Sequence, residues 1–221
     1  MALIEQEIEL IIHNKRLILM NVRIKMMVLI GIALSSCHTV KETDYLSNYE
    51  VLEKGDLLER VWQAPNASIP QSARIQLNTI DTRSIQDHEM ISASQAKEIL
   101  TSRLLTTGKT KEINITTNKN SQTTEFAILE ISIVKMTPGS AAARILAGEL
   151  GAGHAIVQVE GKLLRKSNGE ALFIFSDRRG ASGLAGIKDL AGDQGKNLVT
   201  KLLTAIADDI VAELDQLVKR S

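Results

Sequence analysis

Two runs of apolar residues joined by an Asn-Gly dipeptide constrain the fold of this chain most. Apolar and polar residues alternate over residues 155–163, and residues 171–176 form a second apolar-rich run. Between them lies Lys166-Ser167-Asn168-Gly169, and Asn-Gly favours a tight hairpin turn because both residues accept positive φ angles. The sequence therefore predicts an antiparallel β-hairpin over these residues.

Three further segments have strand patterns. Residues 73–80 alternate with a period of two and are predicted to form the first strand. Residues 113–116 are a short alternating run, and residues 126–136 have the apolar density of a central strand. The polar turn at 118–121 lies between these two runs, so a second hairpin is predicted there.

Helix signals separate the strands. Ser92 and Gln95 form a capping-box pattern, which predicts a helix from Ser92 to about Thr107 that Gly108 ends. Pro138 and Gly139 introduce strong helix formers over residues 141–150. Residues 197–218 carry an apolar stripe at helical spacing, formed by Leu198, Leu202, Ile206, Ile210, Leu214 and Leu217. This order predicts an α+β fold, with a mostly antiparallel sheet, helices packed on one face and a long C-terminal helix.

The N-terminal region has the layout of an export signal. Arg23 and Lys25 precede a nine-residue apolar stretch, Met26 to Leu34, which is shorter than the roughly 20 residues of a transmembrane helix. The run Leu34-Ser35-Ser36-Cys37 then resembles the lipobox of bacterial lipoproteins. That resemblance implies that Cys37 is acylated and becomes the first residue after cleavage, and two or more acyl chains give stable anchoring.

These features divide the chain into four parts. Residues 1–19 are predicted to be a spurious extension, because Glu5, Glu7 and Glu9 place acidic charge where an export signal is basic. The alternative is an amphipathic helix over residues 4–19. Residues 20–36 are predicted to be the signal peptide, 37–70 the lipid anchor with a tether or docking segment, and 71–221 a single periplasmic α+β domain.

The predicted tether contains both tyrosines of the chain. Tyr45 and Tyr49 are four residues apart in a protein with only 3% aromatic residues. They indicate either a segment that docks onto the domain or a local turn with packing tyrosines.

Composition argues against several function classes. Lysine plus arginine and aspartate plus glutamate number 26 each, so no net field attracts nucleic acid. The single cysteine cannot form an internal disulfide, and its predicted acylation removes it as a nucleophile.

No catalytic constellation, cofactor or metal site is predicted. The glycines of residues 148–153 follow a predicted helix and precede a strand, which is the reverse of a phosphate-binding loop. His13, His38, His88 and His154 lack a short ligand spacing. The cluster Asp87-His88-Glu89 is interpreted as a solvated loop.

The run Asp177-Arg178-Arg179 is the best candidate for a polar contact surface. Paired arginines can bind a carboxylate or a phosphate in a bidentate manner. The alternative is an Asp-Arg pair solvated at the edge of the sheet.

Several motifs together resemble a known family. They are the lipobox, Tyr45-Leu46-Ser47-Asn48-Tyr49, and Gly139-Ser140-Ala141-Ala142-Ala143-Arg144 followed by Gly151-Ala152-Gly153. On these motifs the chain resembles the uncharacterised bacterial lipoproteins grouped as domain of unknown function 3313. The resemblance implies an envelope lipoprotein and supplies no catalytic residue.

The expected function is therefore that of a non-enzymatic lipoprotein. We expect acylated Cys37 to hold it in the bacterial outer membrane, because His38 replaces the aspartate that retains enteric lipoproteins at the inner membrane. Its domain is expected to face the periplasm and to bind other envelope proteins, as an accessory part of an envelope or secretion assembly. The alternative is a periplasmic ligand-binding protein or hydrolase that uses Asp87, His88 or the Arg178-Arg179 pair.

Overall fold

The computed structural model describes residues 39–88, 90–118, 126–139, 154–181 and 194–219. The chain divides into two units, residues 1–37 and 38–221, and every described residue belongs to the second unit. The predicted signal, Cys37, the predicted helix over 141–150 and the glycines of 148–153 lie outside the described residues. Within the described ranges, no helix has both the length and the apolar character needed to cross a bilayer.

The described strands form one seven-stranded sheet in the order β1-β2-β7-β6-β5-β3-β4. Their bounds are β1 Glu53–Lys54, β2 Arg60–Gln63, β3 Arg74–Leu77, β4 Asn114–Thr116, β5 Ala127–Thr137, β6 Ala155–Arg165 and β7 Ala171–Ala181. All neighbouring strands are antiparallel except β3, which is parallel to both β4 and β5. The predicted α+β class is thereby confirmed, including the hairpin of β6 and β7.

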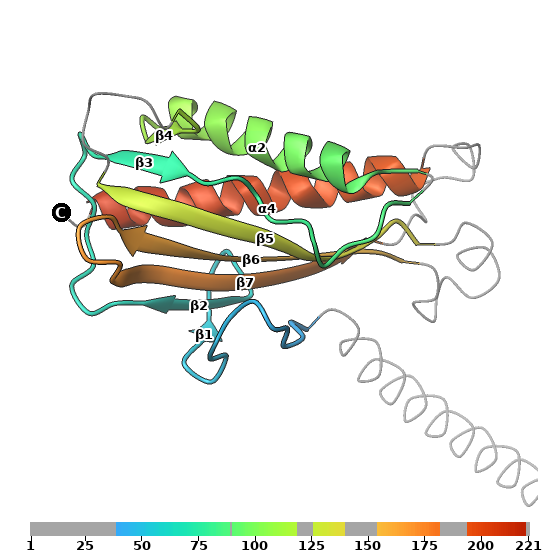
Figure 1. The fold of residues 1–221 in the computed structure, drawn as a ribbon, viewed down its shortest axis with the longest axis horizontal. Coiled ribbons are helices and arrows are strands. Elements are labelled where there is room, and N and C mark those ends of the chain that lie inside the picture. Colours follow the sequence, from blue (N-terminus) through green and yellow to red (C-terminus); the bar gives the residue numbers. More distant parts are fainter. Residues whose placement is uncertain (1–38, 89, 119–125, 140–153, 182–193, 220–221) are drawn as a thin grey trace, which may run out of the picture. The chain divides into compact units, whose positions relative to one another are not determined.

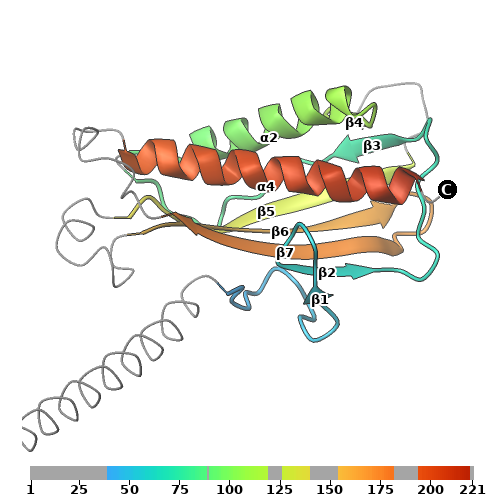
Figure 2. The ribbon, with the colours of Figure 1, turned by 180° about the vertical axis from the view of Figure 1, so that it is seen from behind.

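Two helices, α2 (Ala93–Thr110) and α4 (Gln194–Lys219), pack together on one face of the sheet. Figures 1 and 2 show both helices on the same side of the strands. On α4 the buried residues follow the predicted stripe, with Ile206, Ile210 and Leu214 fully buried. Asp208 of α4 also accepts hydrogen bonds from Arg103 and Thr107 of α2, each at 2.7 Å.

The start of α2 is as predicted, but its end is not. Ser92 and Gln95 form the reciprocal capping box. Gly108, however, lies inside the helix, which continues to Thr110. A Cβ atom on Gly108 would lie 3.0 Å from Cδ1 of Ile115 and 3.2 Å from the Ile113 carbonyl oxygen, so this glycine permits a close approach to β4.

The predicted hairpin between 113–116 and 126–136 is wrong. Strand β3 lies between β4 and β5, and β4 pairs with β3 in parallel. The connection from β3 to β4 contains α2, as a parallel pair requires a long crossover. This crossover places α2 over the sheet beside α4, which a local hairpin would not do.

Strand β7 is longer than predicted. It continues through Asp177-Arg178-Arg179 to Ala181, whereas the sequence indicated an end at Ser176 and a loop from Gly180. The charged residues remain in the strand because β6 pairs with it over this whole length, down to Ala155 opposite Ala181.

The Phe175 ring of β7 lies directly against Gly161 of β6. A Cβ atom at this position would lie 2.4 Å from Cζ of Phe175 and 2.8 Å from the Glu130 carbonyl oxygen. Phe175 is fully buried. The glycine thus provides the space in which the Phe175 ring lies.

Candidate functional site

The candidate site is the contact between the sheet and residues 39–58, which we call the N-terminal segment. This segment directly follows the predicted lipobox. Along β6, Val157 and Val159 belong to the hydrophobic core, whereas Gln158 and Glu160, which alternate with them, contact the N-terminal segment. Side chains alternate between the faces of a strand, so residues 41–49 of the segment cover the sheet face opposite the helices. Farther along the segment, β1 extends the sheet itself.

Glu160 is the centre of the contact and is fully buried. Its Oε2 accepts hydrogen bonds from the Tyr49 and Thr43 hydroxyls, both at 2.7 Å. Its Oε1 accepts from Nε2 of Gln158 at 2.7 Å and from the Ser176 hydroxyl at 3.0 Å. Four donors therefore satisfy the carboxylate, two of them from the N-terminal segment, as a buried charge requires.

The first contacts occur very close to Cys37 in the sequence. The Val40 amide donates to Oε1 of Glu59 at 2.7 Å. The Lys41 amide donates to Oε1 of Gln158 at 3.2 Å, and Nε2 of Gln158 donates to the Lys41 carbonyl at 2.5 Å. The segment is therefore attached to the domain from the third residue after Cys37.

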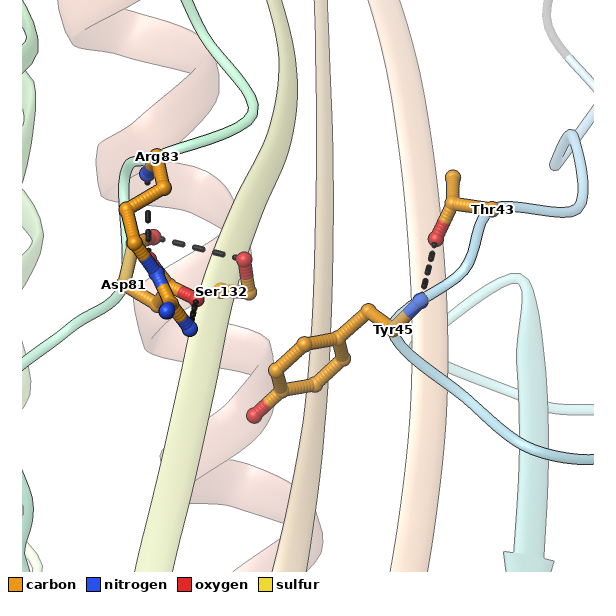
Figure 3. A network of polar contacts seen from close by, with 5 residues as sticks. All are labelled: Thr43, Tyr45, Asp81, Arg83 and Ser132. Carbon is orange, nitrogen blue, oxygen red and sulfur yellow. Dashed lines mark hydrogen bonds and ion pairs between the residues drawn. The ribbon is translucent and has the colours of Figure 1, made fainter.

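Tyr45 extends the contact across the sheet. Figure 3 shows its ring pointing from the N-terminal segment toward the strand that carries Ser132. The Nζ atom of Lys162 lies 5.4 Å from the ring centroid. Burial raises the pKa of the Tyr45 hydroxyl, and the charges of Glu130, Asp81 and Glu160 raise it further. The pKa of Tyr49 is also raised, first by its burial.

Asp81 and Arg83 form a separate pair near this region. Oδ2 of Asp81 lies 2.8 Å from a terminal guanidinium nitrogen of Arg83, and the Asp81 carbonyl accepts from the Ser132 hydroxyl (Figure 3). The hydrogen bond from the Arg83 side chain is the main cause that lowers the pKa of Asp81 to about 2. The Arg83 side chain is 90% exposed.

The three residues of the predicted polar contact surface point to different places. Nε of Arg179 lies 2.7 Å from Oδ2 of Asp177, and its guanidinium also contacts Asp209 of α4 and the Leu57 carbonyl. Asp177 and Arg178 are buried, and Arg178 donates to Oε1 of Gln158. Burial raises the pKa of Asp177, and Arg179 opposes this shift.

The other sequence candidates are not brought together with this run. Oδ1 of Asp87 accepts from the Ala93 amide at 2.7 Å, at the start of α2, and Nδ1 of His88 accepts from the Met90 amide. Among the described residues, no group of three His, Cys, Asp or Glu side chains could hold a metal ion. Asp87 and His88 thus lie just before α2 and bind backbone amides near its start.

Sequence reasoning missed the buried polar residues Gln158, Glu160 and Ser176, and the half-buried Thr43 that contacts them. The alternation in Val157-Gln158-Val159-Glu160 is the same as that of a strand with one face in water. The available signal was the pair of tyrosines upstream, whose hydroxyls need partners when they are buried.

Residues 66–186 match the family model described as a domain of unknown function, DUF4410. The chain belongs to this family. The resemblance to domain of unknown function 3313 was therefore wrong. The run Tyr45 to Tyr49 lies outside the matched residues, and the motifs near Gly139 and Gly151 consist mostly of small residues that occur in many proteins.

Several solved structures are similar to part of this chain. The PelC dodecamer from Paraburkholderia phytofirmans is 15% identical, with coverage of 66% of this chain and 95% of that chain and a TM-score of 0.40. Lipoprotein GNA1162 from Neisseria meningitidis is 15% identical, with coverage of 62% and 99% and a TM-score of 0.34. A minor lipoprotein from Acinetobacter baumannii is 9% identical, with coverage of 64% and 90% and a TM-score of 0.34. No curated protein matches the chain.

Proposed function

We propose that this protein is a non-enzymatic lipoprotein of the bacterial outer membrane, anchored by acylated Cys37, whose periplasmic domain binds other envelope proteins. The observation that carries the proposal is the position of the first domain contact. The lipobox ends at Cys37, and Val40 is already hydrogen-bonded to Glu59. A mature chain that begins at Cys37 would thus retain the whole described domain.

The short connection between Cys37 and the first domain contact limits the distance between the domain and the membrane. Three residues span at most about 10 Å, since an extended chain covers about 3.3–3.6 Å per residue. The acyl chains of Cys37 would lie in the hydrocarbon layer, so the domain would be held at the membrane surface. In this proposal the N-terminal segment holds the domain close to the anchor and is not a flexible tether.

The proposed partner contact uses the part of the open sheet face beyond the N-terminal segment. Ile128, Leu164 and Ile174 are half-buried there. Ile128 is opposite Leu164, and Ile174 is opposite Lys162, on neighbouring strands. Partly exposed apolar side chains that gather on one face support a protein contact.

The anchor is tested by labelling cells with a fatty acid that carries a reporter group. We expect the wild-type protein to be labelled and to fractionate with outer membranes. Cys37→Ser should remove the label and release the protein to the soluble fraction. A labelled Cys37→Ser protein would contradict the proposal.

The partner contact is tested by photo-crosslinking in intact envelopes. A photoreactive residue at Ile174 should give crosslinks to other envelope proteins, whereas one at Lys201, exposed on α4, is the matched control. Recovery of only the monomer at Ile174, or equal products at both positions, would contradict partner binding.

A further inference from the structure

The N-terminal segment presents two large apolar side chains to the outside. Among the described residues, the exposed large hydrophobics are Val51 and Leu57, which are 40% and 38% exposed. Their neighbours Leu52 and Leu58 are 4% and 1% exposed. At both places a buried leucine therefore packs into the domain, and the side chain of the residue before it is exposed.

Both side chains are linked to the stretch nearest Cys37. Leu57 is two residues from Glu59, which accepts from the Val40 amide. Val51 is two residues from Tyr49, whose hydroxyl lies 2.8 Å from the Thr43 hydroxyl. The Leu57 carbonyl is also held by Arg179 at 3.1 Å. These contacts keep the two apolar side chains on the part of the domain that directly follows the anchor.

The charges of this segment select the kind of surface that it can meet. Its exposed charged residues are five acids and two lysines, namely Glu42, Asp44, Glu50, Glu53, Asp56, Lys41 and Lys54. An anionic surface attracts basic segments and repels acidic ones. The primary ammonium group of phosphatidylethanolamine, a zwitterionic phospholipid, can instead donate charge-assisted hydrogen bonds to carboxylates.

We propose that the exposed side of the N-terminal segment rests on a zwitterionic bilayer, with Val51 and Leu57 entering the headgroup layer. This inference rests on the proposed acylation of Cys37, which brings the segment to the membrane. The contact would fix the orientation of the domain, since two side-chain contacts and the anchor together define a plane.

The test uses the full acylated protein in vesicles of phosphatidylethanolamine and phosphatidylcholine. Leu57→Cys and Val51→Cys are each labelled with a nitroxide, which reacts at the new thiol because acylation occupies Cys37. Lys201→Cys on α4 is the exposed control. On vesicle binding, collisions with a water-soluble nickel chelate should fall severalfold at positions 51 and 57, collisions with oxygen should rise, and position 201 should not change.

A second arm replaces part of the zwitterionic lipid with phosphatidylglycerol. The protection at 51 and 57 should weaken at low salt and recover as salt screens the repulsion. Labels at 51 and 57 that stay as water-accessible as the label at 201, in protein that floats with the vesicles, would overturn this inference and leave the anchor intact. Greater protection on anionic lipid would overturn the assignment to a zwitterionic surface. Protein that does not float would instead defeat the acylation proposal, and this inference with it.

Discussion

Strand β6 presents Val157 and Val159 to the core beneath the helices and Gln158 and Glu160 to the N-terminal segment. At these four residues both faces are covered, but by different interactions. The helix-covered face is closed by apolar burial, which depends on area and tolerates some exchange of side chains. The opposite face is closed by hydrogen bonds to one buried carboxylate, which depend on particular atoms. Loss of a single group should therefore act globally on the first face and locally on the second.

The largest effect is expected on the helix-covered face. Phe175→Ala should lower the free energy of unfolding by about 3–5 kcal/mol, because it leaves a cavity beside Gly161. Chemical denaturation measures this loss. Ile174→Ala, which removes a half-buried side chain from the opposite face of the same strand, is the control and should cost less. Equal losses would remove the distinction between the faces.

The second effect concerns the buried carboxylate. Glu160→Gln replaces one accepting oxygen with an amide NH₂ that faces hydrogen-bond donors, so we expect a loss of about 1–3 kcal/mol. The N-terminal segment should detach before the domain unfolds, which limited proteolysis and hydrogen exchange at residues 43–49 would detect. Glu170→Gln in the exposed hairpin turn is the matched control. Unchanged protection of residues 43–49 would show that Glu160 does not hold the segment.

A third effect appears at alkaline pH. The pKa values of Tyr45 and Tyr49 are raised in the folded protein, so above about pH 10 the unfolded chain releases protons that the folded protein keeps. The contribution of the two tyrosines to the free energy of unfolding is therefore fully present below about pH 10 and is lost as the pH rises further. Denaturation curves between about pH 9 and about pH 11 should fall more steeply for the wild type than for Tyr45→Phe or Tyr49→Phe. Parallel curves would show that the tyrosines are not shielded by the docked segment.

The smallest effect is expected at the exposed pair. Arg83→Ala should lower the free energy of unfolding at neutral pH only slightly, because the Arg83 side chain is 90% exposed. The pKa of Asp81 should instead rise from about 2 toward its ordinary value of 3.8, which an NMR titration would follow. The depressed pKa contributes stability above pH 3.8 that is lost as the pH falls toward 2, and this acid loss should shrink in the variant. An Asp81 pKa that stays at about 2 would assign the shift to groups other than the Arg83 side chain.

These contrasts explain what could be predicted from the sequence. Apolar periodicity identified α4, β5, β6 and β7, and the capping box located the start of α2, because these signals are local. The partner of β4 could not be predicted in this way, since its parallel pairing with β3 depends on the path of α2. The role of Glu160 could not be predicted from local patterns either, because its burial depends on Thr43 and Tyr49, which are more than a hundred residues away in the chain.

The space at Gly161 links two positions that the sequence separates. Phe175 needs a neighbour without a side chain, and Gly161 without an aromatic ring opposite would leave a hole in the middle of the sheet. Neither residue can change alone without cost, because a larger residue at 161 meets the ring and a smaller one at 175 leaves a void. In other members of the family, the residues at these two positions should therefore change together. The pair can then serve as a marker for aligning distant sequences.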